Sequence, residues 1–109
     1  MKRGEIWTVS GGPGYAGKPR PALIVQSDLL PETQSVLTCG LTGHRGAALM
    51  SRPPVEPDSG NGIREASEVM VDKMTAVHRS KLGRCIGALG PEDMTRVEQA
   101  MLLVLGFGD

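Results

Sequence analysis

The chain is poor in aromatic residues: of its 109 residues, only Trp7, Tyr15 and Phe107 carry aromatic rings. A hydrophobic core must therefore be built from valine, leucine, isoleucine and methionine. The scarcity also argues against RNA-binding modules that stack successive bases on aromatic side chains. The length is that of one small domain, so we expect residues 1–109 to form a single domain.

Cysteine is scarce as well. Cys39 and Cys85 are far apart, and each lies in an apolar run that resembles a strand. This placement predicts two buried, reduced thiols in a cytoplasmic protein, with a disulfide or a catalytic cysteine as the alternative. Neither His44 nor His78 has a carboxylate or cysteine at metal-ligand spacing. We therefore expect no metal and no cofactor.

No apolar stretch is long enough to span a bilayer, and no signal peptide is recognisable. We expect a cytoplasmic protein that makes no membrane contact. The formal net charge is zero, but residues 1–54 carry six basic and three acidic groups, and the remainder carries six and nine. Such a basic side could bind phosphates locally, although scattered surface charge would give the same count.

Short apolar runs separated by glycine and proline indicate a mainly β protein. The expected strands are 5–9, 22–26, 36–41, 67–71 and 84–89, with 47–50 as a possible further strand and 74–78 left ambiguous. Residues 10–17 and 52–62 are rich in glycine and proline, and we expect both segments to be loops.

The C-terminal segment has the pattern of a helix. Pro91 follows Gly90 at the expected first turn, and two acidic residues come next, near the positive end of the helix dipole. Met94, Val97, Met101 and Leu105 recur at helical spacing, and Gly106 ends the pattern. The whole pattern predicts a compact SH3-like barrel of short strands, closed by this helix.

The most informative segment is Lys18–Val25, which reads KPRPALIV. Arg20 lies between two prolines at the start of an apolar, β-branched run. Each proline fixes its own φ and forces the preceding residue into an extended conformation. A stiffly mounted arginine at the base of a strand is suited to contact an anion.

The order of motifs resembles the MazF/PemK toxin family. The motifs are RGEIW at residues 3–7, a glycine-rich loop, RPALIV at residues 20–25, a hydrophobic strand ending at Thr42, and VMVDK at residues 69–73. The resemblance extends from Lys2 to about Leu105. It implies the fold already expected, an SH3-like barrel of the CcdB/MazF type, and the activity of a toxin endoribonuclease in a type II toxin–antitoxin system.

The resemblance also implies a metal-independent catalytic centre at Arg20 and Thr42. Cleavage by attack of the ribose 2′-hydroxyl leaves a 2′,3′-cyclic phosphate and a 5′-hydroxyl. Negative charge grows on the phosphate oxygens during this attack, and a guanidinium can stabilise it. A threonine hydroxyl can donate to the same phosphate. Thr38 is the competing choice if the strand register differs.

Further residues near these motifs are candidates for substrate binding. Asp72 could orient Arg20 or a base, or it could be a strand-end charge held by backbone amides. Met70 departs from the family pattern, because certain members carry a basic residue there that is implicated in catalysis; this shifts weight to Arg20 and Thr42. The expected substrate-binding residues are Lys18, His44, Arg45, Asp72 and Lys73.

The resemblance further implies a homodimer that binds single-stranded RNA and a MazE-like antitoxin peptide. The alternative hypothesis is a non-catalytic, CcdB-like toxin that binds DNA gyrase. The activity of that toxin lies in a Trp-Gly-Ile ending, whereas this chain has Phe107 near its end and lacks the motif.

Overall fold

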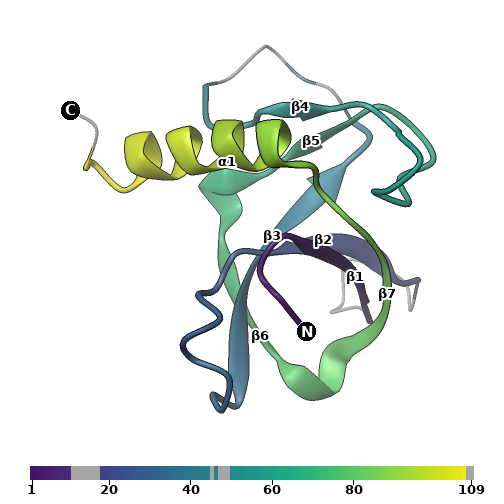
Figure 1. Cartoon of the computed structure of the whole chain (residues 1–109), viewed down its shortest axis with the longest axis vertical. Coiled ribbons are helices and arrows are strands. Elements are labelled where there is room, and N and C mark those ends of the chain that lie inside the picture. Colours follow the sequence, from purple (N-terminus) through teal and green to yellow (C-terminus); the bar gives the residue numbers. More distant parts are fainter. Residues whose placement is uncertain (11–17, 45, 47–49, 108–109) are drawn as a thin grey trace.

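The computed structural model contains a strongly curled antiparallel sheet with a single helix across one end (Figure 1). It describes residues 1–10, 18–44, 46 and 50–107. The sheet order is β4-β5-β3-β2-β1-β7, and β6 pairs separately with β3. The strands are β1 (Glu5–Val9), β2 (Arg20–Ile24), β3 (Ser35–Thr42), β4 (Pro54–Val55), β5 (Ser67–Val69), β6 (Thr75–His78) and β7 (Leu82–Ala88).

The first two strands form where the apolar runs predict them. Ile6 of β1 is fully buried. Residues 22–25 are all buried, as expected of a strand that is covered on both faces. β2 begins at Arg20, two residues earlier than predicted, because Arg20 and Pro21 already pair with Val9 and Thr8 of β1.

β3 changes partners along its length. Its first residues, 35–38, pair with β6, and residues 38–40 pair with β2. The ladder to β2 ends at Ala22 opposite Gly40. On the other edge of β3, Leu41 and Thr42 pair with β5, beyond the residues that pair with β6. Pro21 has no N–H and cannot continue the ladder between β2 and β3. The two strands therefore separate at this point.

Several predicted boundaries were wrong. The segment expected to be a loop at 52–62 contains β4, and the strand expected at 67–71 ends at Val69. Val71, Asp72 and Lys73 form the 3₁₀ helix η2 (Val71–Lys73), which turns the fully buried Val71 into the core. The ambiguous segment at 74–78 is β6, stabilised by pairing with β3. Residues 11–17 and 47–49 lie outside the described part.

Cys85 corrects the prediction of two buried thiols. Cys39 is fully buried, but Cys85 is exposed on β7, although both are free cysteines. The strand pattern around Cys85 is interrupted by β-bulges, so its side chain does not follow the alternation that places apolar residues in the core.

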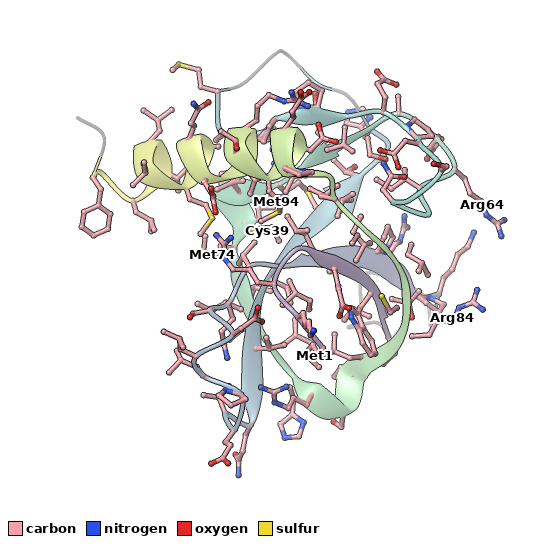
Figure 2. All side chains as sticks on the ribbon, in the orientation of Figure 1. Met1, Cys39, Arg64, Met74, Arg84 and Met94 are labelled. Atoms are coloured by element: carbon pink, nitrogen blue, oxygen red, sulfur yellow. The ribbon has the colours of Figure 1, made fainter. Side chains whose placement is uncertain are left out.

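The helix α1 (Pro91–Val104) covers one end of the core. Gly90 is its N-cap, and Gly106 adopts a φ of 81° just after its end. Val97 and Ala100 are buried in the same cluster as Ile6 and Val71. In Figure 2, the labelled side chains of Cys39, Met74 and Met94 lie between the helix and the sheet.

An ion pair of 2.7 Å joins Arg3, just before β1, to Glu98 of α1. It fastens the helix to the start of the sheet at the surface of the molecule. Across the described ranges, the helices are too short or too polar to cross a membrane.

Candidate active site

A cleft of about 330 Å³ opens where β2 and β3 separate. Arg20 and Thr42 would face each other if the register of Ala22 opposite Gly40 continued by two residues. Both residues line this cleft, which we call the Arg20–Thr42 cleft. The structure thus brings the two predicted catalytic residues to one opening, and the missing N–H of Pro21 explains why the opening forms there.

Thr42 and Thr38 both border this cleft but are not equivalent. Thr38 is 1% exposed, and its hydroxyl donates a 3.3 Å hydrogen bond to the carbonyl oxygen of Thr75. Thr42 is half-buried, and its Oγ1 accepts a 3.1 Å hydrogen bond from the backbone N–H of His44. The Thr42 hydroxyl keeps its own proton for donation to a ligand. The geometry therefore favours Thr42.

Lys73 adds a positive charge to the same cleft. It lies at the end of η2, and Met70 lines the wall just before that helix. A Cβ at Gly40 would lie 3.0 Å from Cε of Met70, so the methionine side chain covers the backbone of β3. Met70 therefore provides an apolar surface in the cleft, and Lys73 provides the ammonium group.

Asp72 has a partner other than Arg20. Its carboxylate accepts hydrogen bonds of 2.9 and 3.1 Å from Nε and Nη2 of Arg52, an arrangement that binds both oxygens. These bonds lower the pKa of Asp72 below its usual value, and they raise the pKa of Arg52. Asp72 lies next to Lys73 in the chain but does not line the Arg20–Thr42 cleft.

The remaining predicted residues are dispersed. Lys18 lines a neighbouring cleft together with Arg20. His44 is exposed, and the contact that ties it to the site is the bond from its backbone N–H to Thr42. Arg45 lies outside the described residues.

The neighbouring cleft, about 650 Å³ in volume, contains residues that the sequence did not single out. Its charged lining residues are Lys18, Arg20, Arg64, Glu65 and Arg84, and we call it the basic cleft. The available sequence signal was the pair of glycines within β7, at positions 83 and 87, because an isolated glycine in a strand indicates a bulge.

The thiol of Cys39 takes no part in either cleft. Burial, and to a lesser extent the charge of Asp72, raises its pKa to about 11, so it stays protonated near neutral pH. Within the ranges that the structure describes, no group of three or more histidine, cysteine, aspartate or glutamate residues is placed to hold a metal ion.

Comparison with known proteins places the chain in a family. Residues 2–105 match the family described as PemK-like, MazF-like toxin of type II toxin–antitoxin system. The chain is 40% identical over 107 residues to the probable endoribonuclease MazF of Mycolicibacterium smegmatis, and the match covers 98% of each protein. The resemblance expected from the sequence is confirmed.

Solved structures confirm the expected fold. An endoribonuclease from a mycobacterial species, in complex with its cognate antitoxin, matches with a TM-score of 0.81 at 22% identity, covering 97% of this chain and 95% of that one. The Mycobacterium tuberculosis toxin MazF-mt6 matches with a TM-score of 0.77 at 24% identity, covering 94% and 96%. The curled sheet with one C-terminal helix is the architecture of these toxins.

Proposed function

Because the chain belongs to the PemK-like, MazF-like toxin family of type II toxin–antitoxin systems and is an endoribonuclease toxin of that family, we propose that it cleaves single-stranded RNA in the Arg20–Thr42 cleft without a metal ion. The observation that carries this proposal is the position of Arg20 and Thr42 on the two strands that border the opening. Single strands are favoured because in-line attack needs a backbone that can rotate, and because unpaired bases expose their edges.

The proposed reaction is a transfer within the RNA backbone. The 2′-oxygen forms a bond to the adjacent phosphorus, and the bond from phosphorus to the 5′-oxygen breaks. The guanidinium of Arg20 donates to the non-bridging oxygens, on which negative charge grows. The Thr42 hydroxyl, oriented by the N–H of His44, donates to the same phosphate and holds it for attack.

Proton transfer in this scheme involves water. A guanidinium stays protonated in proteins, so Arg20 acts by its charge and not as a base. Water accepts the proton from the 2′-hydroxyl and supplies one to the departing 5′-oxygen. The products are a 2′,3′-cyclic phosphate and a 5′-hydroxyl.

The other predicted residues take supporting roles in the proposal. Lys73, inside the cleft, contacts the phosphate as a second cation. Lys18, His44 and Arg45 contact RNA that extends beyond it. Asp72 acts through its ion pair with Arg52, which holds η2 and therefore the position of Lys73.

Partners follow from the family. The proposal includes a homodimer, an antitoxin of the MazE type whose peptide covers the RNA site, and a cytoplasmic location. Large apolar side chains are exposed in the last turn of α1 and just after it, as expected of a surface that meets another protein chain. They are Leu102, Leu103, Val104, Leu105 and Phe107.

The alternative of a gyrase-binding toxin is not favoured. The match over residues 2–105 is to the MazF-like family, and the Arg20–Thr42 cleft has no role in that alternative. Phe107, which is 77% exposed, is the residue that would then control toxicity.

The test uses purified protein and a mixed-sequence single-stranded RNA in the presence of a metal chelator. We expect cleavage, with 2′,3′-cyclic phosphate ends identified by mass spectrometry. Intact RNA with a folded protein, or 3′-hydroxyl ends, would reject the proposed reaction. Ser59, which is exposed and lines neither cleft, offers Ser59→Ala as a control for the loss of a hydroxyl group elsewhere on the protein.

A further inference from the structure

The basic cleft adjoins the Arg20–Thr42 cleft. Arg20, Pro21 and Leu41 line both, so a strand of RNA that reaches Arg20 can extend into either. The two differ in charge, because the basic cleft adds Lys18, Arg64 and Arg84 to Arg20. Four cations in the lining of one cleft suit a polyanion better than a small neutral ligand.

Arg84 is placed by an irregularity in β7. Trp7 pairs with Cys85 and Val9 with Leu82, so Gly83 and Arg84 together oppose Thr8. The hydroxyl of Thr8 accepts a 3.1 Å hydrogen bond from the backbone N–H of Arg84 and so stabilises this bulge. A bulge turns a side chain away from the regular alternation.

Arg64 is held beside β7 by a close backbone contact. Gly62 has a φ of 70°, and a Cβ there would overlap the carbonyl oxygen of Ile86, so only glycine fits. Asn61, fully buried, accepts a 3.0 Å hydrogen bond from the N–H of Ile63 and fixes the same turn. Figure 2 shows Arg64 and Arg84 projecting from the same side of the molecule, from two different elements.

Glu65 is the one carboxylate that lines the basic cleft. A Cβ at Gly43 would overlap its Oε1, so the carboxylate lies directly over the backbone that follows Thr42. Within the described ranges, this carboxylate has no hydrogen bond or ion pair. The negative charge of Glu65 opposes phosphate binding by the neighbouring arginines. If Glu65 contributes to RNA binding, its carboxylate therefore accepts a hydrogen bond from a donor group on the ligand.

We infer that the basic cleft is a nucleotide subsite in which Arg64 and Arg84 bind backbone phosphate and Glu65 selects a base with an exocyclic amino group. A carboxylate accepts from the N–H and amino donors of guanine, or from the amino groups of cytosine and adenine, whereas uracil has no amino group. The inference rests on the proposed function, because it concerns a nucleotide that flanks the cleaved bond.

The first experiment measures binding without cleavage. A 2′-O-methyl RNA of mixed sequence cannot be cleaved by 2′-hydroxyl attack, and its affinity is measured between 50 and 200 mM salt. Each phosphate contact in a single strand adds about 0.7 to the slope of log affinity against log salt. When salt rises from 50 to 200 mM, the affinity of the natural chain should therefore fall about sevenfold more than the affinity of the Arg64→Ala/Arg84→Ala variant. Lys81→Ala, an exposed cation outside both clefts, is the matched control.

The second experiment reads base preference. Random-sequence RNA is cleaved, and the fragments on both sides of each cut are sequenced, the downstream ones through their 5′-hydroxyl ends. Uracil should be depleted about tenfold at one position beside the cut, and Glu65→Gln should largely abolish that depletion. The same variant should bind mixed RNA as well as the natural chain or more tightly, because a negative charge is removed. Glu32→Gln, in an exposed turn, is the control.

A geometric variant keeps the charge of Glu65 and moves it. Gly43→Ala displaces the carboxylate from its position and should alter the same base preference. If Glu65→Gln and Gly43→Ala both retain the natural preference, Glu65 does not select the base and the inference is wrong.

The outcomes separate this inference from the proposed function. A natural chain that binds 2′-O-methyl RNA through Arg64 and Arg84 but cleaves no RNA would support the subsite and reject the catalysis. A natural chain that cleaves RNA while Arg64→Ala/Arg84→Ala binds as Lys81→Ala does would support the catalysis and overturn the subsite.

Discussion

The two ends of β3 carry the same residue type in different surroundings. Thr38, near the start, lies where β2 and β6 both pair with the strand, and its hydroxyl is used inside the protein. Thr42, at the end, lies beyond the last residue that pairs with β2, with β5 on the opposite edge of the strand, and its hydroxyl can donate outward. Four residues along one strand separate a structural threonine from a candidate catalytic one.

The difference shows that the site arises where the ladder between β2 and β3 ends. Arg20 and Thr42 are not held apart by a special loop; they border the place where a ladder stops at Pro21. Substitutions in the part of β3 that pairs with β2 should affect stability. Substitutions of residues that border the opening beyond that ladder should affect the reaction. Substitutions at four residues test this division.

Of the substitutions at the Arg20–Thr42 cleft, Arg20→Ala should slow cleavage the most. Loss of a donor that stabilises developing charge typically costs about a hundredfold or more in rate. Arg20→Lys should recover little, because an ammonium lacks the planar fork of donors. Single-turnover cleavage of a defined RNA measures both, with circular dichroism to confirm folding. A rate within threefold of the natural chain would remove Arg20 from the mechanism.

Thr42→Ala should slow cleavage by about tenfold to a hundredfold, because one donor to the phosphate is lost while the charge of Arg20 remains. Thr42→Ser keeps the hydroxyl and should retain most of the rate. The measurement is kcat and KM for the three proteins. Equal losses in the alanine and serine variants would mean that the methyl group, and not the hydroxyl, matters.

Thr38→Val, in the part of β3 that pairs with both β2 and β6, should lower the stability of the protein and leave cleavage nearly unchanged. The substitution removes the hydrogen bond from the buried Thr38 hydroxyl to the carbonyl oxygen of Thr75 and should lower the free energy of unfolding by about 1 kcal/mol. Urea denaturation measures the change, and cleavage well below the melting temperature should stay within about threefold. A much slower reaction in a fully folded Thr38→Val protein would show that Thr38 takes part in cleavage and contradict its purely structural role.

Asp72→Asn should have the smallest effect, and the size of that effect depends on pH. Arg52 lowers the pKa of Asp72, so the ionised carboxylate stabilises the fold above its unfolded pKa of about 4, and this stability is lost as pH falls through the folded pKa. The variant should melt slightly lower than the natural chain at pH 7, with the gap closing in acid. A gap that stays constant with pH would mean that the ion pair is not its cause.

Much of the fold could be predicted because its pattern is local. Residues 22–25 and the spacing of Val97 and Met101 report burial directly, and β2 and α1 were predicted from them. β4 and β6 were not, because two residues at Pro54 and a short segment at Thr75 become strands only by pairing with distant partners.

The candidate site divides in the same way. Arg20 and Thr42 follow from motifs that are contiguous in the sequence. The partner of Asp72 is twenty residues away, and no local signal links it to Arg52. Arg64 and Arg84 line one cleft only because Gly62 approaches Ile86 and β7 bulges opposite Thr8, contacts that arise on folding.

The most direct test of the account is a double-mutant cycle between Arg20→Ala and Thr42→Ala, measured as single-turnover cleavage rates in chelator. If both side chains act on one phosphate across the opening between β2 and β3, their effects are coupled, and the double variant should be little slower than Arg20→Ala alone. Effects that simply multiply would show two independent roles and contradict a shared site.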